Sequence, residues 1–289
     1  MRLVYLGSPE AAVPPLRALV AAGHEVLLVV SQPDRKRGRG AALTASPVKA
    51  AATELGLPVT DRVADVFGAV AGGAELGVVV AFGKLIKPDL LAVLPFVNLH
   101  FSLLPRWRGA APVERALLAG DTETGVCLMA LEEGLDTGPV HLCRSTTIGA
   151  DETVSALRDR LVVMGTAMLV EALDAGLGEP HAQEGPPTFA HKLQAEEFAI
   201  DWARPSEQVQ RLVRLGRAWT TFREKRLKVL EVRVVPPVEG LPGALQGLVV
   251  AAGGGGLELL QVQPEGKPVQ SAAAWRNGAR PVDGERLGA

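Results

Sequence analysis

The first half of the chain alternates short apolar runs rich in β-branched residues with longer segments rich in alanine and leucine. The alternation begins with residues 3–6, 15–22, 25–30 and 47–55. Such alternation is typical of the strands and helices of an α/β domain. Residues 76–82 (LGVVVAF) are almost entirely apolar, as expected for a parallel strand covered by helices on both faces. We therefore predict a mostly parallel sheet with this strand near its centre.

The same alternation continues along the chain. Further strands are predicted at residues 96–99, 126–131 and 140–142, and helices over 112–118 and 153–175. The first of these helices starts at a proline, a residue that the first helical turn accepts. These elements complete a single α/β domain.

The character of the sequence changes after Gly176. Residues 177–204 are rich in glycine and proline and show little periodicity, which is typical of a linker. From residue 209 a helical stretch is followed by short alternating runs, with turns that contain proline or glycine. We predict an α/β domain over residues 1–176, the linker over 177–204 and a small OB-like β-barrel over 205–289.

The composition excludes several classes of protein. Hydrophobic residues make up 47% of the chain, charged residues 21%, and the formal net charge is −2, so any nucleic-acid contact must come from local patches. No stretch reaches the roughly 20 apolar residues of a membrane span. Cys127 and Cys143 are too few for a disulfide framework or a zinc site. We expect a monomeric cytoplasmic protein, made in a reducing compartment and binding no metal.

Two polar residues, Asn98 and His100, lie two apart at the carboxyl end of a predicted strand. The two-residue repeat of a strand directs both side chains to the same face. Ligands of open α/β sheets bind outside the carboxyl ends of strands, and Asp136 follows another predicted strand toward the same crevice. A histidine can move protons, an amide can donate to an oxyanion, and a carboxylate can orient the histidine and favour its charged form. A strand-end histidine alone is more often structural.

Two segments resemble the signature of the folate-dependent formyltransferases, and among them of the members that act on methionyl-tRNA: NLHFSLLPRWRGAAPVERALLAGDTETGV and EEGLDTGP. The resemblance begins at GSPEAAVPPLRAL and QPDRKRGRG, and it continues through SPVKAAATELGLPV and FAHKLQAEEFAIDW to LELLQVQPEGK. It therefore covers nearly the whole chain.

The resemblance implies a Rossmann-like formyltransferase domain followed by a β-barrel that binds tRNA. It implies that the formyl group of 10-formyltetrahydrofolate moves to the amino group of initiator methionyl-tRNA, which supports translation initiation. Asn98, His100 and Asp136 match the catalytic residues of the family. The implied folate-binding residues lie in two segments: Phe82, Gly83, Leu85, Ser102, Leu103, Leu104 and Pro105.

Two basic regions are candidates for RNA contact. A predicted loop at residues 33–40 carries Arg35, Lys36, Arg37 and Arg39 with Asp34 as its only acid, and such a loop can contact phosphates. Residues 201–235 contain nine basic and four acidic residues, and Arg211, Arg214 and Arg217 are spaced to share one helix face. The alternative for both regions is an ordinary solvated surface.

Other functions remain open on the sequence alone. The main rival is a formyltransferase that acts on an amino-sugar nucleotide with the same three catalytic residues. A non-catalytic RNA-binding protein is a second alternative. The turn GSPEAA lacks the G-x-G-x-x-G spacing of dinucleotide-binding enzymes, and no histidine or cysteine pair has the spacing of a zinc site.

Overall fold

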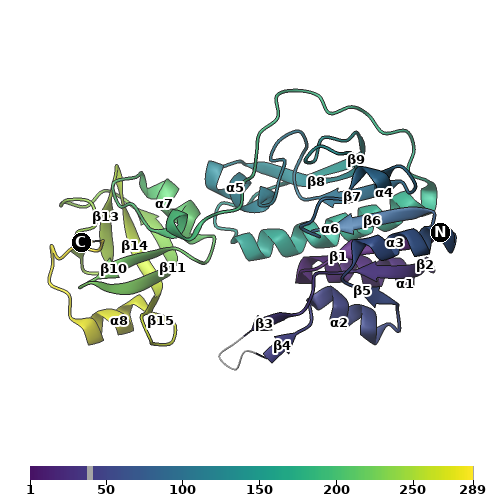
Figure 1. The fold of residues 1–289 in the computed structure, drawn as a ribbon. Coiled ribbons are helices and arrows are strands. Elements are labelled where there is room, and N and C mark those ends of the chain that lie inside the picture. The colour runs from purple at the N-terminus through teal and green to yellow at the C-terminus, as the bar shows by residue number, and fades with distance from the viewer. Residues whose placement is uncertain (38–41, 289) are drawn as a thin grey trace. The chain divides into compact units, whose positions relative to one another are not determined.

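The structure is a computed structural model that describes residues 1–37 and 42–288 of the 289-residue chain (Figure 1). The chain forms two compact units. The first contains Met1–Val113, Glu123–Thr147 and Leu157–His191, and the second contains Glu114–Thr122, Ile148–Ala156 and Lys192–Ala289. The second unit therefore includes two short segments that interrupt the first unit in sequence.

A seven-stranded sheet in the order β5-β2-β1-β6-β7-β8-β9 runs through the first unit. Its strands are β1 (Arg2–Gly7), β2 (Glu25–Val30), β5 (Val59–Thr60), β6 (Leu76–Val80), β7 (Phe96–His100), β8 (Glu123–Ala130) and β9 (Val140–Thr147). The pairings from β5 to β7 are parallel, and β8 and β9 are antiparallel additions at one edge. Strand β6 is the middle strand and is buried throughout, so the predicted parallel sheet and its apolar centre are confirmed.

Helices cover both faces of this sheet. They are α1 (Val13–Ala21), α2 (Pro47–Glu54), α3 (Val66–Ala71), α4 (Pro88–Leu91) and α6 (Val154–Ala175), with short 3-10 turns at Glu10–Ala12 and Val63–Asp65. Helix α5 (Pro112–Ala119) belongs mostly to the second unit. Val66 of α3 and Leu90 of α4 join Phe96 of β7 in one buried cluster. On the opposite face, a Cβ added at Gly165 of α6 would lie 3.0 Å from Leu99, so this helix packs directly on β7.

Tyr5 joins strand β1 to the segment that precedes helix α1. The residue is fully buried in β1, and its hydroxyl donates a hydrogen bond of 2.6 Å to the Ala12 carbonyl. Burial raises the pKa of this phenol well above its ordinary value. The hydroxyl is therefore a neutral donor at physiological pH.

We expect Tyr5→Phe to lower the free energy of unfolding by about 1 kcal/mol, because the buried hydrogen bond from the hydroxyl to the Ala12 carbonyl is lost. Urea denaturation measures the change. Thr53→Val, which removes an exposed hydroxyl that bonds to Lys49 within α2, is the control and should change stability less. An unchanged midpoint for Tyr5→Phe would show that the hydrogen bond contributes nothing.

The second unit is built on an antiparallel sheet in the order β10-β11-β14-β13-β12, with β15 also paired to β14. Its elements are α7 (Ser206–Val213), β10 (Trp219–Phe222), β11 (Lys225–Val235), β12 (Leu245–Gln246), β13 (Val249–Ala252), β14 (Gly255–Pro264), β15 (Gln270–Ser271) and α8 (Ala272–Ala279), with a 3-10 turn at Ala195–Phe198. Phe222 and Trp275 meet edge to face at 5.1 Å in its core. The predicted change from an α/β domain to a C-terminal β domain is confirmed.

The predicted loop over residues 33–40 is partly a β-hairpin, which corrects the expectation. Strand β3 (Arg35–Arg37) pairs antiparallel with β4 (Ala42–Thr44), and the hairpin projects from the first unit (Figure 1). Cross-strand backbone hydrogen bonds form this ribbon without an apolar alternation to mark it. Arg39 lies outside the described residues.

Cys127 and Cys143 form a disulfide across β8 and β9. They lie opposite each other in the antiparallel register, with Cα atoms 4.1 Å apart. One such pair is not the disulfide framework that the cysteine count excluded, and the expected reducing compartment stays a prediction. Among the described residues, no helix is long and apolar enough to span a membrane, and no three acidic, histidine or cysteine side chains form a metal-binding group.

Candidate active site

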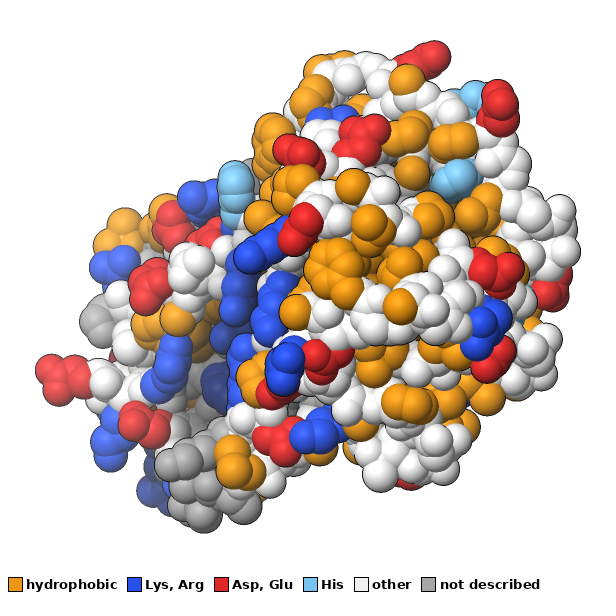
Figure 2. All heavy atoms as spheres, turned by 45° about the vertical axis from the view of Figure 1, so that its right-hand side comes forward, with side chains coloured by type: hydrophobic (Ala, Val, Ile, Leu, Met, Phe, Trp, Pro, Cys, Tyr) orange, Lys and Arg blue, Asp and Glu red, His pale blue; other side chains and the backbone are white. Residues whose placement is uncertain are grey.

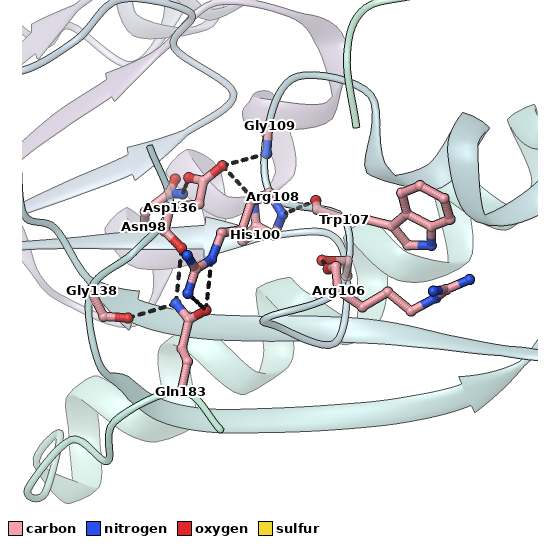
Figure 3. Close-up of polar contacts among 10 residues, drawn as sticks. Asn98, His100, Arg106, Trp107, Arg108, Gly109, Asp136, Gly138 and Gln183 are labelled. Atoms are coloured by element: carbon pink, nitrogen blue, oxygen red, sulfur yellow. Dashed lines mark hydrogen bonds and ion pairs between the residues drawn. The ribbon is translucent and has the colours of Figure 1, made fainter. Parts of the chain in front are cut away.

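Strand β7 carries Asn98 and His100 to the carboxyl edge of the parallel strands (Figure 3). Both residues share the face of Phe96, because side chains alternate along a strand. Asn98 is 9% exposed and His100 is 5% exposed. Buried polar side chains need hydrogen-bond partners, and here the partners come from two loops.

The first loop joins β8 to β9 and contains Asp136. Its Oδ2 atom accepts a hydrogen bond of 2.7 Å from the Gly109 backbone N–H and lies 3.6 Å from His100 Nδ1. Its Oδ1 atom accepts from Asn98 Nδ2 at 3.5 Å. The φ angle of Asp136 is 51°, in the left-handed region that residues other than glycine rarely adopt. One carboxylate thus connects the two residues of β7 to the loop that contains Gly109.

The second loop follows β7 and holds the other nitrogen of His100. Nε2 lies 2.9 Å from the backbone oxygen of Trp107. A carbonyl oxygen only accepts hydrogen bonds, so Nε2 carries a proton in this arrangement. Since Nδ1 faces the Asp136 carboxylate, a doubly protonated ring has an acceptor at each nitrogen. The imidazole is therefore oriented from both sides, as a proton-transfer group must be.

The candidate folate segment at 102–105 lies in the same loop. Ser102 is fully buried, and its hydroxyl donates to the Arg106 carbonyl at 2.6 Å, while the Arg106 N–H donates to the Leu103 carbonyl at 3.0 Å. Leu103, Leu104 and Pro105 are half-buried in this turn. The side chains of Arg106 and Trp107 point away from the polar cluster, with the guanidinium 4.5 Å from the ring centre (Figure 3).

The other candidate folate segment follows β6, the strand next to β7. Phe82 is buried, and its carbonyl accepts a hydrogen bond of 3.1 Å from Gln32 Nε2. Gly83 has a φ angle of 74°, and Leu85 is 74% exposed. Because β6 and β7 are parallel neighbours, this segment and the one at 102–105 leave the sheet at the same edge. Their role in binding folate stays a prediction.

The candidate RNA-binding residues fall in different environments. Arg35 is exposed on β3, in the same strand as Lys36 and Arg37. Asp34, the one acid of this segment, forms an ion pair of 2.8 Å with Lys49. The negative charge of Asp34 is therefore compensated within the first unit, which leaves the basic residues of the hairpin to set the local charge.

Arg211 and Arg214 hold backbone segments within the second unit. Arg211 donates to the Ala119 carbonyl at 3.1 Å, and Arg214 donates at 2.8 Å to the carbonyls of both Gly149 and Glu152. Burial lowers the pKa of the Arg214 guanidinium from its ordinary value. Helix α7 ends at Val213, so the prediction that Arg217 shares its face is wrong. Arg217 instead lies over the Phe198 ring at 4.2 Å. RNA contact by Arg211 and Arg214 stays a prediction.

Sequence analysis missed two residues that complete the site. Gly109 supplies the backbone N–H bound to Asp136, and its φ angle of 120° favours glycine. Gln183, in the segment predicted as a linker, bonds to both Arg108 and the backbone around Asp136. A glycine between a basic and an apolar stretch was the only local signal, and Gln183 had none.

The buried Asn98 and His100 and the half-buried Asp136 form a candidate site that can support general acid–base chemistry at a carbonyl carbon, because a proton-transfer group lies beside an amide donor and a carboxylate. The Formyl transferase family model matches residues 1–173, and the model of the Formyl transferase C-terminal domain matches residues 192–280. The chain belongs to the formyltransferase family.

Relatives of this chain fall within one subgroup of the formyltransferases. A protein of Roseobacter denitrificans named methionyl-tRNA formyltransferase is 46% identical over 98% of each chain, and one of Jannaschia with the same name is 45% identical over 99% of this chain and 100% of its own. Among solved structures, an N-formyltransferase of Helicobacter canadensis has a TM-score of 0.68 at 14% identity, covering 91% of this chain and 98% of its own. That likeness shows a shared fold.

Proposed function

We propose that this protein transfers the formyl group of 10-formyltetrahydrofolate to the amino group of initiator methionyl-tRNA in the cytoplasm, as a monomer. Two kinds of observation support the proposal. Relatives named methionyl-tRNA formyltransferase match almost the whole chain at 43–47% identity, and the second unit contains the region that matches the family's C-terminal domain. The single observation that carries the chemistry is the convergence of Asn98, His100 and Asp136 at the sheet edge.

The proposed reaction makes one C–N bond and breaks another. The amine attacks the formyl carbon, the formyl oxygen becomes an oxyanion, and collapse breaks the bond to the folate nitrogen. The products are the formylated amine and tetrahydrofolate, and the proton lost by the amine balances the one gained by the departing nitrogen. No metal and no covalent enzyme intermediate enter this balance.

Each catalytic side chain has one role in this sequence. His100 carries the proton from the amine toward the leaving nitrogen, and for this step Nε2 exchanges its contact with the Trp107 carbonyl for the substrate. Asn98 Nδ2 has two hydrogens, and only one is directed at Asp136, so the other can donate to the oxyanion. Asp136 orients the ring through Nδ1 and is itself held by the Gly109 N–H. The candidate folate segments after β6 and β7 leave the sheet at the same edge as Asn98 and His100, which supports their proposed role in holding the donor.

The acceptor is tested by offering the enzyme alternatives. Purified protein and 10-formyltetrahydrofolate are incubated separately with charged initiator tRNA and with a panel of amino-sugar nucleotides. We expect transfer to the tRNA alone. Transfer only to a sugar nucleotide would keep the catalytic residues and reject the RNA acceptor, and no transfer to any acceptor would reject the proposed activity.

The basic hairpin is the proposed tRNA contact in the first unit. The face drawn in Figure 2 mixes basic, acidic and apolar side chains, as the net charge of −2 implies, whereas strand β3 is a run of three basic residues. A local cluster of this kind can bind phosphates, and such binding weakens with salt.

Changing Arg35, Lys36, Arg37 and Arg39 together to alanine should raise KM for tRNA and leave kcat nearly unchanged. Each lost phosphate contact should lower the slope of log Kd against log salt concentration by about 0.7 to 0.9. Fluorescence titration of labelled tRNA over a salt series measures the slope. Arg62→Ala, at a 74% exposed side chain of the same unit, is the control. Equal slopes for the quadruple variant and the parent would remove the hairpin from the interface.

A further inference from the structure

Gln183 makes four hydrogen bonds inside the candidate active site (Figure 3). Its side-chain nitrogen donates to the backbone oxygens of Asp136 at 2.9 Å and Gly138 at 2.8 Å. Its side-chain oxygen accepts from Arg108 Nε at 3.0 Å and from a terminal nitrogen of the same guanidinium at 2.7 Å. Both hydrogens of the amide and its oxygen are thus used.

We propose that Gln183 is a positioning residue for formyl transfer, which rests on the proposed function. Its amide fixes the loop that contains Asp136 to the segment that contains Arg108 and Gly109. The carboxylate of Asp136 reaches His100 only while these two loops keep their spacing.

The conformation of Asp136 explains why the hydrogen bonds of Gln183 are needed. A non-glycine residue at a φ angle of 51° costs free energy and persists only where its surroundings hold it. Gln183 holds the residue by its backbone oxygen, and the Gly109 N–H holds it by its carboxylate. Asp136 is therefore held at its backbone and at its carboxylate, and Oδ2 lies 3.6 Å from His100 Nδ1.

The segment that carries Gln183 is itself anchored on both sides. Before it, His181 and Val140 exchange two backbone hydrogen bonds of 2.7 and 2.8 Å. After it, the Thr188 carbonyl accepts from the Arg108 N–H at 2.9 Å, and the Ala190 N–H donates to the Arg108 carbonyl at 2.7 Å. These anchors place the Gln183 amide between the two loops.

The chemistry of the four contacts is specific to an amide. Two carbonyl oxygens require a donor, and the Arg108 guanidinium requires an acceptor. A carboxylate at this position would place an oxygen against the Asp136 and Gly138 carbonyls. A thioether of the same length would satisfy neither side. The variants Gln183→Glu and Gln183→Met therefore remove the hydrogen bonds of Gln183 in two different ways.

The test compares kcat, KM and thermal stability of Gln183→Glu and Gln183→Met with those of the parent. We expect kcat to fall by about 10- to 100-fold, as misplacement of a catalytic group by about 1 Å does, while KM for both substrates stays within about twofold. The pH profile of kcat should change shape in the variants, because Asp136 no longer faces His100. Glu184→Gln, at the exposed neighbouring residue, is the control and should behave as the parent.

Equal kcat values for the parent and Gln183→Met, with unchanged pH profiles, would overturn the positioning role. A lower melting temperature with unchanged kcat would overturn it as well, because the contacts would then be only structural. If Gln183→Glu does not fold, Gln183→Met decides. Absence of transfer by the parent itself would instead reject the proposed function, so the two failures are distinguishable.

Discussion

Replacing His100 with alanine should lower kcat for formyl transfer by about 10²- to 10⁴-fold, the usual contribution of a positioned proton-transfer group. The ring is the one group in the cluster that can both accept and release a proton near neutral pH. It is also held at both nitrogens, by Trp107 O at 2.9 Å and by Asp136 Oδ2 at 3.6 Å. Alanine removes the proton carrier without adding bulk at the carboxyl edge of β7.

Single-turnover transfer to charged initiator tRNA measures this loss without interference from product release. His141→Ala, on β9 of the same unit, is the matched control and should retain the parent rate. Binding of tRNA should be nearly unchanged in His100→Ala, because the basic hairpin is intact. A rate within about threefold of the parent, far below the usual contribution of general acid–base catalysis, would contradict the assignment of His100.

Asp136→Asn should lower kcat by about 10²- to 10⁴-fold, because it removes the charge that faces the histidine and disrupts its orientation. Asn98 Nδ2 and the Gly109 N–H both donate to the carboxylate. An amide can offer an oxygen to only one of them, and its NH₂ group then faces the other donor. The substitution therefore breaks the contacts of the Asp136 carboxylate although the size of the side chain is preserved.

We expect Asp136→Asn to fold, because the backbone conformation at this position suits asparagine. Asparagine is among the few residues that tolerate a positive φ angle such as the 51° found here. Far-UV circular dichroism and thermal melting should match the parent, and Asp61→Asn, at an exposed residue, is the control for loss of a negative charge. Parent-like kcat in a folded Asp136→Asn protein would show that the carboxylate does not orient the histidine.

Much of the first unit could be predicted because its signals are local. The β-branched run at 76–82 and the alternating segments before it carry the period of strands and helices in their own residues, and they became β6 and its neighbours. The shared face of Asn98 and His100 follows from the same two-residue repeat. These features depend on neighbours in sequence and need no knowledge of distant contacts.

The features that were missed depend on pairing between distant residues. Gln183 meets the Asp136 backbone across 47 residues, from a segment without periodicity. Cys127 and Cys143 become partners only through the register of β8 and β9. The β3–β4 ribbon has no apolar alternation, since its first strand reads Arg-Lys-Arg. In each case a hydrogen-bond register or a loop contact decided the outcome, and neither can be read from composition.

One measurement tests the central claim most directly. The protein is incubated with 10-formyltetrahydrofolate labelled with ¹³C in the formyl group and with charged initiator tRNA, and the methionine released from the tRNA is analysed by mass spectrometry. The proposed function predicts a labelled formyl group on the methionine amine with the parent protein, and a strongly reduced signal with His100→Ala. An unlabelled methionine with the parent, or equal labelling by both proteins, would contradict it.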